Sequence, residues 1–190
     1  MEEEILFRIC SFSSDFDNYS PLSIMKQLFK SKHCSNVNNI NKRKVQFNYI
    51  INDKIIYIQL YEISDLTKRH NICYCADFYL IFVNLNDEEN KILNSLNTIL
   101  LYINETYSSN TKCNILGIVN KNIEHKIITE KEMNDFISSK NINNYDYMEI
   151  NPKEDIESAF RILLREIIEN KANNKEEENV SMSQGICYIY

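Results

Sequence analysis

The most apolar segment of the chain runs from residue 78 to residue 83, Phe-Tyr-Leu-Ile-Phe-Val, without any alternation of apolar and polar positions. Such a run, rich in aromatic and β-branched residues, is typical of a strand buried on both faces in a parallel sheet. A second run of this type follows at residues 113–119, and residues 87–107 between them carry apolar side chains at helical spacing. The three segments therefore predict one βαβ unit.

The N-terminal part predicts a strand followed by a helix. Residues 5–10 form a short apolar run, as expected of a strand. Ser20 and Pro21 suit the N-cap and the first turn of a helix whose apolar side chains repeat on one face. The polar, asparagine-rich stretch 31–43 is predicted to be a long loop.

A hairpin is predicted next. Residues 45–51 alternate between apolar and polar side chains, whereas residues 55–61 are more continuously apolar. The intervening Asn52 and Asp53 favour a tight turn, so the two runs predict an antiparallel hairpin with residues 45–51 at the sheet edge. Residues 64–75 predict an irregular or helical segment.

The C-terminal part predicts a helix, a strand and a final helix. Thr129 suits an N-cap, and Glu132 three residues later completes a capping box for a helix over residues 129–139. Tyr145–Ile150 is predicted to be a short strand. The last helix is expected to begin near Lys153.

This order of elements predicts an α/β fold with three layers. The expected sheet has six strands, mostly parallel, with one antiparallel edge hairpin. A single domain is expected over residues 1–170, which is long enough to bury a core. Residues 171–190 are polar and acidic, and we expect a disordered tail.

Composition narrows the range of functions. The formal net charge is −6 and no basic patch stands out, which argues against nucleic acid as a partner. The chain has only two glycines, Gly117 and Gly185, where average usage would give roughly thirteen. A glycine-rich loop that could cradle phosphates is therefore not expected.

The six cysteines are irregularly spaced, and no secretory signal precedes them. We therefore expect free thiols and a cytoplasmic location. Cys73 and Cys75 have a single residue between them and no matching second pair, so a zinc site is not expected. The sequence contains no run of eighteen consecutive apolar residues, so no membrane span is predicted.

Four short stretches, together with the order of elements, resemble the Ras-like small GTPases. Residues 75–78, Cys-Ala-Asp-Phe, resemble the family's entry into its fourth strand, and residues 116–121, Leu-Gly-Ile-Val-Asn-Lys, resemble the strand with the guanine-reading N-K-x-D motif. Residues 149–153 resemble the family's E-T-S-A-K loop, and residues 156–160 resemble the opening of its last helix. The resemblance covers approximately residues 5–170.

The resemblance implies a Ras-like G domain and places a few residues at its nucleotide site. Asn120 and Lys121 match the start of the N-K-x-D motif, and Lys153 falls in the E-T-S-A-K-like loop. However, Ile123 stands where the motif has its aspartate. GTP or GDP would be the cofactor if this site still worked. The alternative is that Asn120 and Lys121 are simply a polar strand end.

The phosphate-binding motif of the family is missing. Its G-x-x-x-x-G-K-[ST] sequence would follow the first strand, where residues 11–22 contain neither glycine nor lysine. Asp15 and Asp17 lie there instead and would repel a triphosphate. Two unit charges 4 Å apart repel by about 4 kcal/mol at an effective dielectric constant of 20. We expect Phe12, Phe16 and Tyr19 to fill the empty phosphate site.

The two switch motifs are also degenerate. Residues 31–43 contain no threonine that could bind magnesium. The family's D-x-x-G becomes Glu62-Ile-Ser-Asp65, and Leu66 replaces the glutamine that positions water. We therefore predict no catalytic residues, no metal and no cofactor.

The predicted function is that of a pseudo-GTPase, a protein-interaction module that does not hydrolyse nucleotide. The resemblance suggests a Rab-like subunit of a larger vesicle-trafficking or scaffold assembly. The alternative is a divergent but active small GTPase of membrane traffic, which would bind and hydrolyse GTP. A small-molecule binder that uses the vacated nucleotide cleft is a third hypothesis.

Two features are candidates for contacts outside the nucleotide site. We expect a protein partner of acidic character to bind the surface formed by residues 45–51, 55–61 and 64–75, because the edge strand there offers unpaired backbone groups. Lys68, Arg69 and His70 would form the basic rim of this surface, the alternative being a solvated turn. Cys187 has the position of a C-terminal C-a-a-X lipidation box, although Tyr190 is an unusual last residue. Lipidation of Cys187 would make the protein a peripheral membrane protein. The alternative is that Cys187 lies near the end of the tail by chance and is not lipidated.

Overall fold

The computed structural model describes residues 5–15, 18–68, 70–106, 112–119, 127–140 and 144–169. The chain divides into two compact units, Met1–Glu157 and Ser158–Tyr190, and each is described by itself. The first unit contains the sheet and the candidate site.

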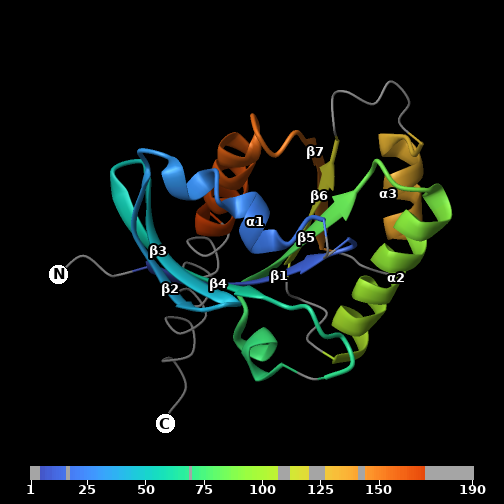
Figure 1. Cartoon of the computed structure of the whole chain (residues 1–190), viewed down its shortest axis with the longest axis horizontal. Coiled ribbons are helices and arrows are strands. Elements are labelled where there is room, and N and C mark those ends of the chain that lie inside the picture. The colour runs from blue at the N-terminus through green and yellow to red at the C-terminus, as the bar shows by residue number, and fades with distance from the viewer. Residues whose placement is uncertain are drawn as a thin grey trace, which may run out of the picture. The chain divides into compact units, whose positions relative to one another are not determined.

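The first unit is built on a seven-stranded mixed sheet with the order β2-β3-β4-β1-β5-β6-β7 (Figure 1). Its strands are β1 (Ile5–Ser13), β2 (Cys34–Asn41), β3 (Lys44–Ile51), β4 (Lys54–Glu62), β5 (Phe78–Asn84), β6 (Lys112–Ile118) and β7 (Tyr145–Ile150). β1 pairs in parallel with β4 and β5, and β6 pairs in parallel with β5 and β7. The expected α/β class, with a mostly parallel sheet and an antiparallel edge, is confirmed.

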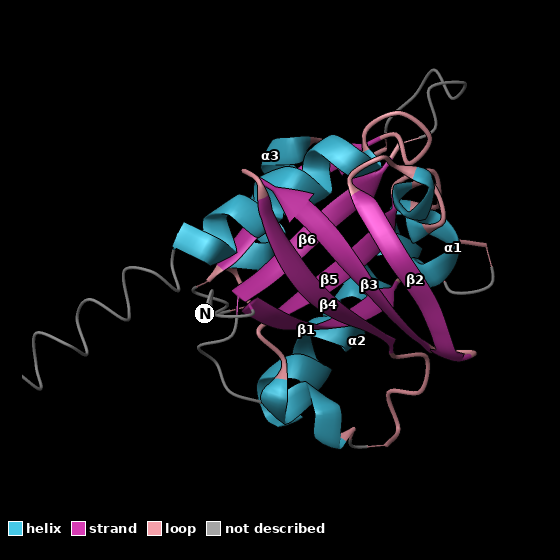
Figure 2. Ribbon diagram, turned by 90° about the vertical axis from the view of Figure 1, so that its left-hand side faces the viewer, coloured by secondary structure: helices cyan, strands magenta, loops and turns pink. Residues whose placement is uncertain are grey.

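The expectation of six strands is wrong, because β2 adds a strand outside the hairpin. β3 and β4 form the predicted antiparallel hairpin, in which Ile51 lies opposite Lys54. The predicted loop at residues 31–43 instead contains β2, which pairs antiparallel to β3 and becomes the edge of the sheet (Figure 2). Seven of its eight residues are exposed, so it lacks the apolar alternation that marks a half-buried strand.

The first unit has three α-helices among its described residues. They are α1 (Pro21–Met25), α2 (Glu89–Thr106) and α3 (Glu130–Ser138), with 3₁₀ turns η1 (Leu28–Lys30) and η2 (Asn71–Cys75). α1 and α3 start where their capping residues predict. The Ser20 hydroxyl accepts a hydrogen bond from the Ser23 N–H at the start of α1. Both halves of the predicted capping box of α3 are formed between Thr129 and Glu132.

The helices lie on both faces of the sheet (Figure 1). β5, the predicted central strand, is buried at every residue from Phe78 to Asn84. α2 and α3 pack with one face of the sheet, where Phe12 lies edge-to-face against Tyr79 and Tyr102. α1 and η1 lie on the other face, where Phe29 contacts Phe47. Burial of such side chains contributes about 1.5–3 kcal/mol each.

Gly117 is the only glycine among the described residues, and the close packing around it explains its presence. A Cβ atom at this position would lie 2.7 Å from Leu85 Cδ1 and 2.8 Å from the Tyr147 hydroxyl. Both distances are shorter than van der Waals contact, so any side chain here would push Leu85 or Tyr147 away.

Residues 156–169 are helical, close to the predicted start near Lys153. Ile156, Phe160, Leu163 and Leu164 are buried, as their helical spacing predicts. No helix in the described part of the chain is both long and apolar enough to cross a membrane.

Candidate functional site

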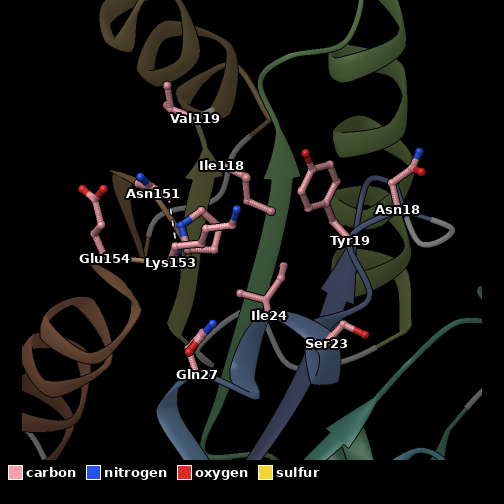
Figure 3. A pocket seen from close by; sticks show the side chains of 11 residues that line it. Asn18, Tyr19, Ser23, Ile24, Gln27, Ile118, Val119, Asn151, Lys153 and Glu154 are labelled. Carbon is pink, nitrogen blue, oxygen red and sulfur yellow. Dashed lines mark hydrogen bonds between the residues drawn. The ribbon is translucent and has the colours of Figure 1, made fainter. Parts of the chain in front are cut away.

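A cleft of about 500 Å³ opens at the carboxyl-terminal ends of β6 and β7, beside α1 (Figure 3). Ligands of open α/β sheets usually bind beyond the carboxyl ends of the strands, so this is where a site is expected. The lining residues come from three segments: Asn18, Tyr19, Ser23, Ile24 and Gln27; Ile118 and Val119; and Asn151, Pro152, Lys153 and Glu154.

The cleft combines an apolar floor with amide and hydroxyl groups. Ile24 and Tyr19 lie on the α1 side, opposite Ile118 from β6, while Lys153 extends toward Ile118 (Figure 3). Asn18, Gln27 and Asn151 supply amide groups, which can both donate and accept hydrogen bonds. The cleft is also lined by one lysine and one glutamate, Lys153 and Glu154, whose opposite charges balance, so the lining suits a molecule with little net charge.

The loop after β7 is held in place by its own hydrogen bonds. The Asn151 side-chain oxygen accepts a hydrogen bond from the Lys153 N–H at 3.2 Å, and the Asn151 N–H donates to an Asp155 carboxylate oxygen at 2.9 Å. At the end of β6, the Val119 N–H donates to the Ile150 carbonyl oxygen at 2.9 Å. Lys153, which sequence reasoning placed in this site, is therefore in the cleft on an ordered turn.

The segment after β1 is tied to the end of β5. The Ser14 N–H donates to the Phe82 carbonyl oxygen at 2.9 Å, and the Asn84 N–H donates to the Ser14 hydroxyl oxygen at 2.9 Å. The Asn84 amide nitrogen then donates to the Asp15 carboxylate at 2.9 Å, and Asn18 donates to the same carboxylate at 3.0 Å. These bonds place a carboxylate in the loop where the resemblance would place a phosphate.

A second carboxylate lies at the N-terminus of α1. Glu62, the last residue of β4, is only 7% exposed, and its Oε2 accepts a hydrogen bond from the Leu22 N–H at 3.0 Å. The first N–H groups of a helix have no partner within the helix and carry partial positive charge. Here a side chain of the protein satisfies one of them, and sequence reasoning did not foresee this contact between residues 40 positions apart.

The structure describes two of the three aromatic residues that were expected to fill the phosphate site, and the two lie in different places. The prediction for Phe12 is wrong, because β1 extends to Ser13 and directs Phe12 into the core beneath α2. Tyr19 lines the cleft. Phe16 lies outside the described residues.

The basic turn at residues 68–70 is bonded to its own loop. The Lys68 ammonium group lies 3.0 Å from an Asp65 carboxylate oxygen, and a ring nitrogen of His70 lies 2.8 Å from the Asp65 carbonyl oxygen. The Thr67 hydroxyl bond, together with Lys68, holds the pKa of the Asp65 carboxyl well below its usual range. Lys68 is 75% exposed, but part of its charge is neutralised locally.

Several predicted site residues lie outside the described part of the chain: Asn120, Lys121, Arg69 and Cys187. Among the described residues, no group of three or more histidine, cysteine, aspartate or glutamate side chains is arranged to hold a metal ion. The structure thus brings together Lys153 and Tyr19 in the cleft, while Lys68 and His70 belong to a different loop.

No protein-family model matches the chain, and no curated protein matches it significantly.

Proposed function

We propose that the protein is a pseudo-GTPase: a Ras-like domain that has lost nucleotide chemistry and serves as a protein-interaction module. In this proposal it is a Rab-like subunit of a larger trafficking or scaffold assembly. The order of elements and the four stretches quoted above support the Ras-like assignment, and six of the seven strands agree with the expected sheet. β2 is then an addition to that sheet.

The bond between Glu62 and the Leu22 N–H carries this proposal. A phosphate bound at the start of α1 would need the N–H group that the carboxylate already occupies. It would also face the Asp15 carboxylate, held in the same loop region by Asn84. Each unit of like charge at about 4 Å adds about 4 kcal/mol of repulsion at an effective dielectric constant of 20. Binding of GTP or GDP is therefore strongly disfavoured.

A thermal-melting experiment tests the proposal. A ligand at one hundred times its dissociation constant stabilises a protein by about 2.7 kcal/mol, which for a chain of this length raises the melting temperature by roughly 5–10 °C. We expect GTP and GDP with magnesium to leave the melting temperature unchanged, whereas an ordinary small GTPase in the same buffer serves as the positive control. A clear rise with either nucleotide would support the divergent, active GTPase instead.

The cleft supports a second candidate function, the binding of a small molecule without phosphate groups. Its volume of about 500 Å³ lies within the range of ordinary ligand sites, and three amide side chains line it. In the same assay, stabilisation by a neutral polar compound, lost in Gln27→Leu but kept in the control Lys131→Ala on α3, would favour this function. Stabilisation that survives Gln27→Leu would place the compound elsewhere.

A further inference from the structure

A long stretch of the chain is basic and free of acidic residues. Between residues 18 and 52 there is no aspartate or glutamate, whereas six lysines and arginines occur there: Lys26, Lys30, Lys32, Lys42, Arg43 and Lys44. The whole chain has a formal net charge of −6, so the remainder carries −6 minus +6, or −12. This basic segment is not evident from the net charge of the whole chain, and the expectation that no basic patch stands out did not take it into account.

The fold places these cations around the edge strand β2. Lys30 and Lys32 precede the strand, and Lys42 and Arg43 follow it in the turn to β3. All four side chains are exposed, and none forms an ion pair with a carboxylate within the described part of the chain. Over an eight-residue strand, the two basic ends lie about 26 Å apart.

Between its basic ends, β2 carries no charge at all. Its sequence is Cys-Ser-Asn-Val-Asn-Asn-Ile-Asn, and Val37 and Ile40 are 40% and 45% exposed. β2 is the outermost strand of the sheet, so one row of its backbone N–H and C=O groups faces away from β3 (Figure 2). An exposed edge with unpaired backbone groups is a template for a further strand.

Side chains on both faces of β2 border hollows that an added strand could use. On the α1 face, Val37 and Asn39 line a groove of about 480 Å³ together with Lys26, Lys42 and the nearly buried Glu62, whose carboxylate is hydrogen-bonded to the Leu22 N–H. On the other face, Asn36 and Asn38 line a hollow of about 360 Å³ beside β3 and β4. Successive side chains of an added strand point to opposite faces of the sheet, so each hollow could receive every second side chain of that strand.

The charges decide what can occupy this edge. If a second copy of the protein paired antiparallel through β2, the basic residues before the strand would face the basic residues after it. An extended segment with acidic residues at both ends has the complementary pattern.

We propose that β2 is the docking strand for an extended acidic segment of a partner protein. The segment adds to the sheet beside β2, with uncharged residues opposite the strand and acidic side chains near Lys30 and Lys32 at one end and near Lys42 and Arg43 at the other. The inference rests on the proposed interaction function and names the chemical character of the partner. Because β2 pairs with β3, which was expected to be the edge of the docking surface, the proposal moves that edge from residues 45–51 to β2.

The probe is a blocked peptide of about ten residues, with alternating valine and threonine in its centre and two glutamates at each end. Binding to the full chain is measured by fluorescence anisotropy without nucleotide, and backbone amides are followed by hydrogen exchange. We expect binding that weakens with added salt and slows the exchange of β2 amides. A peptide with lysine in place of glutamate should not bind.

Two charge reversals provide the matched comparison. Lys42→Glu with Arg43→Glu at the strand end should weaken peptide binding by roughly tenfold or more. The same change of charge at α3, Lys131→Glu in the helix with Lys140→Glu in the turn that follows it, should leave binding within about twofold. Lys42, Arg43 and Lys131 are exposed, so the first double variant should keep the melting temperature of the original. Lys140 is half-buried with its ammonium group 4.7 Å from the centre of the Phe136 ring, so the second double variant should lose a little stability without losing peptide binding.

A third peptide separates strand addition from simple charge attraction. Its alternate backbone nitrogens are methylated, which removes the hydrogen bonds along one edge while keeping every charge. Equal binding of this peptide, of the lysine peptide, or of both double variants would overturn the proposal. So would a single-stranded oligonucleotide or anionic vesicles that bind much more tightly than the acidic peptide.

The outcome is independent of the nucleotide test. Nucleotide binding with intact peptide binding would overturn the pseudo-GTPase proposal but leave the docking strand standing. Absence of both would overturn the docking strand alone.

Discussion

Removing the Glu62 carboxylate tests whether it stabilises the start of α1. Its Oε2 accepts a hydrogen bond from the Leu22 N–H at 3.0 Å, and the side chain is only 7% exposed. Hydrogen bonds to charged groups contribute about 1.5–3 kcal/mol. Glu62→Ala should therefore lower the free energy of unfolding by about 2 kcal/mol, which corresponds to a fall in melting temperature of roughly 4–8 °C.

Glu62→Gln is the matched control, because it keeps an acceptor oxygen and a similar shape but removes the charge. It should lose about half as much stability, since a neutral hydrogen bond contributes about 0.5–1.5 kcal/mol. Urea denaturation followed by circular dichroism gives both values, and hydrogen exchange of the Leu22 amide gives a local reading. The amide should exchange faster in Glu62→Ala than in the original. If Glu62→Ala were as stable as the original, with unchanged exchange at Leu22, the carboxylate would not hold the helix.

Three further changes probe other parts of the first unit. Asn114 is 1% exposed, and its side chain has no hydrogen-bond partner within the described residues. Asn114→Leu should therefore raise the free energy of unfolding, measured in urea, by about 1–2 kcal/mol. A lower free energy of unfolding would refute this. Gly117→Ala should cost about 1–3 kcal/mol, and adding Tyr147→Phe should recover part of it by removing one of the two overlapping atoms. The hydrogen bond from Thr67 lowers the pKa of Asp65 in the folded state, so Asp65→Asn should lower the melting temperature at neutral pH. The difference in melting temperature between the variant and the original should shrink as the pH falls below about 4. A difference that does not change with pH would contradict this.

The buried elements could be predicted because their signals are local. The apolar run at residues 78–83, the hairpin around Asn52 and Asp53, and the capping box of α3 each depend on neighbours in the sequence. β2 could not be predicted in this way, since its residues are exposed and polar and the strand exists through its backbone pairing with β3.

The candidate site was predictable only in part. The resemblance of residues 149–153 to the E-T-S-A-K loop was enough to predict Lys153 as a site residue. The contact of Glu62 with Leu22 joins residues 40 positions apart, and that of Asp15 with Asn84 joins residues 69 positions apart. No local pattern marks such pairs, so the sequence predicts that Asp15 would repel a phosphate but predicts neither its hydrogen bond with Asn84 nor the place of Glu62 at the start of α1.

Titration calorimetry with GDP and GTP in the presence of magnesium tests the central proposal most directly. The account predicts no heat of binding at micromolar protein concentration, with magnesium present or removed by a chelator. A dissociation constant below about 1 μM, equivalent to a binding free energy of about −8 kcal/mol, would contradict the pseudo-GTPase proposal.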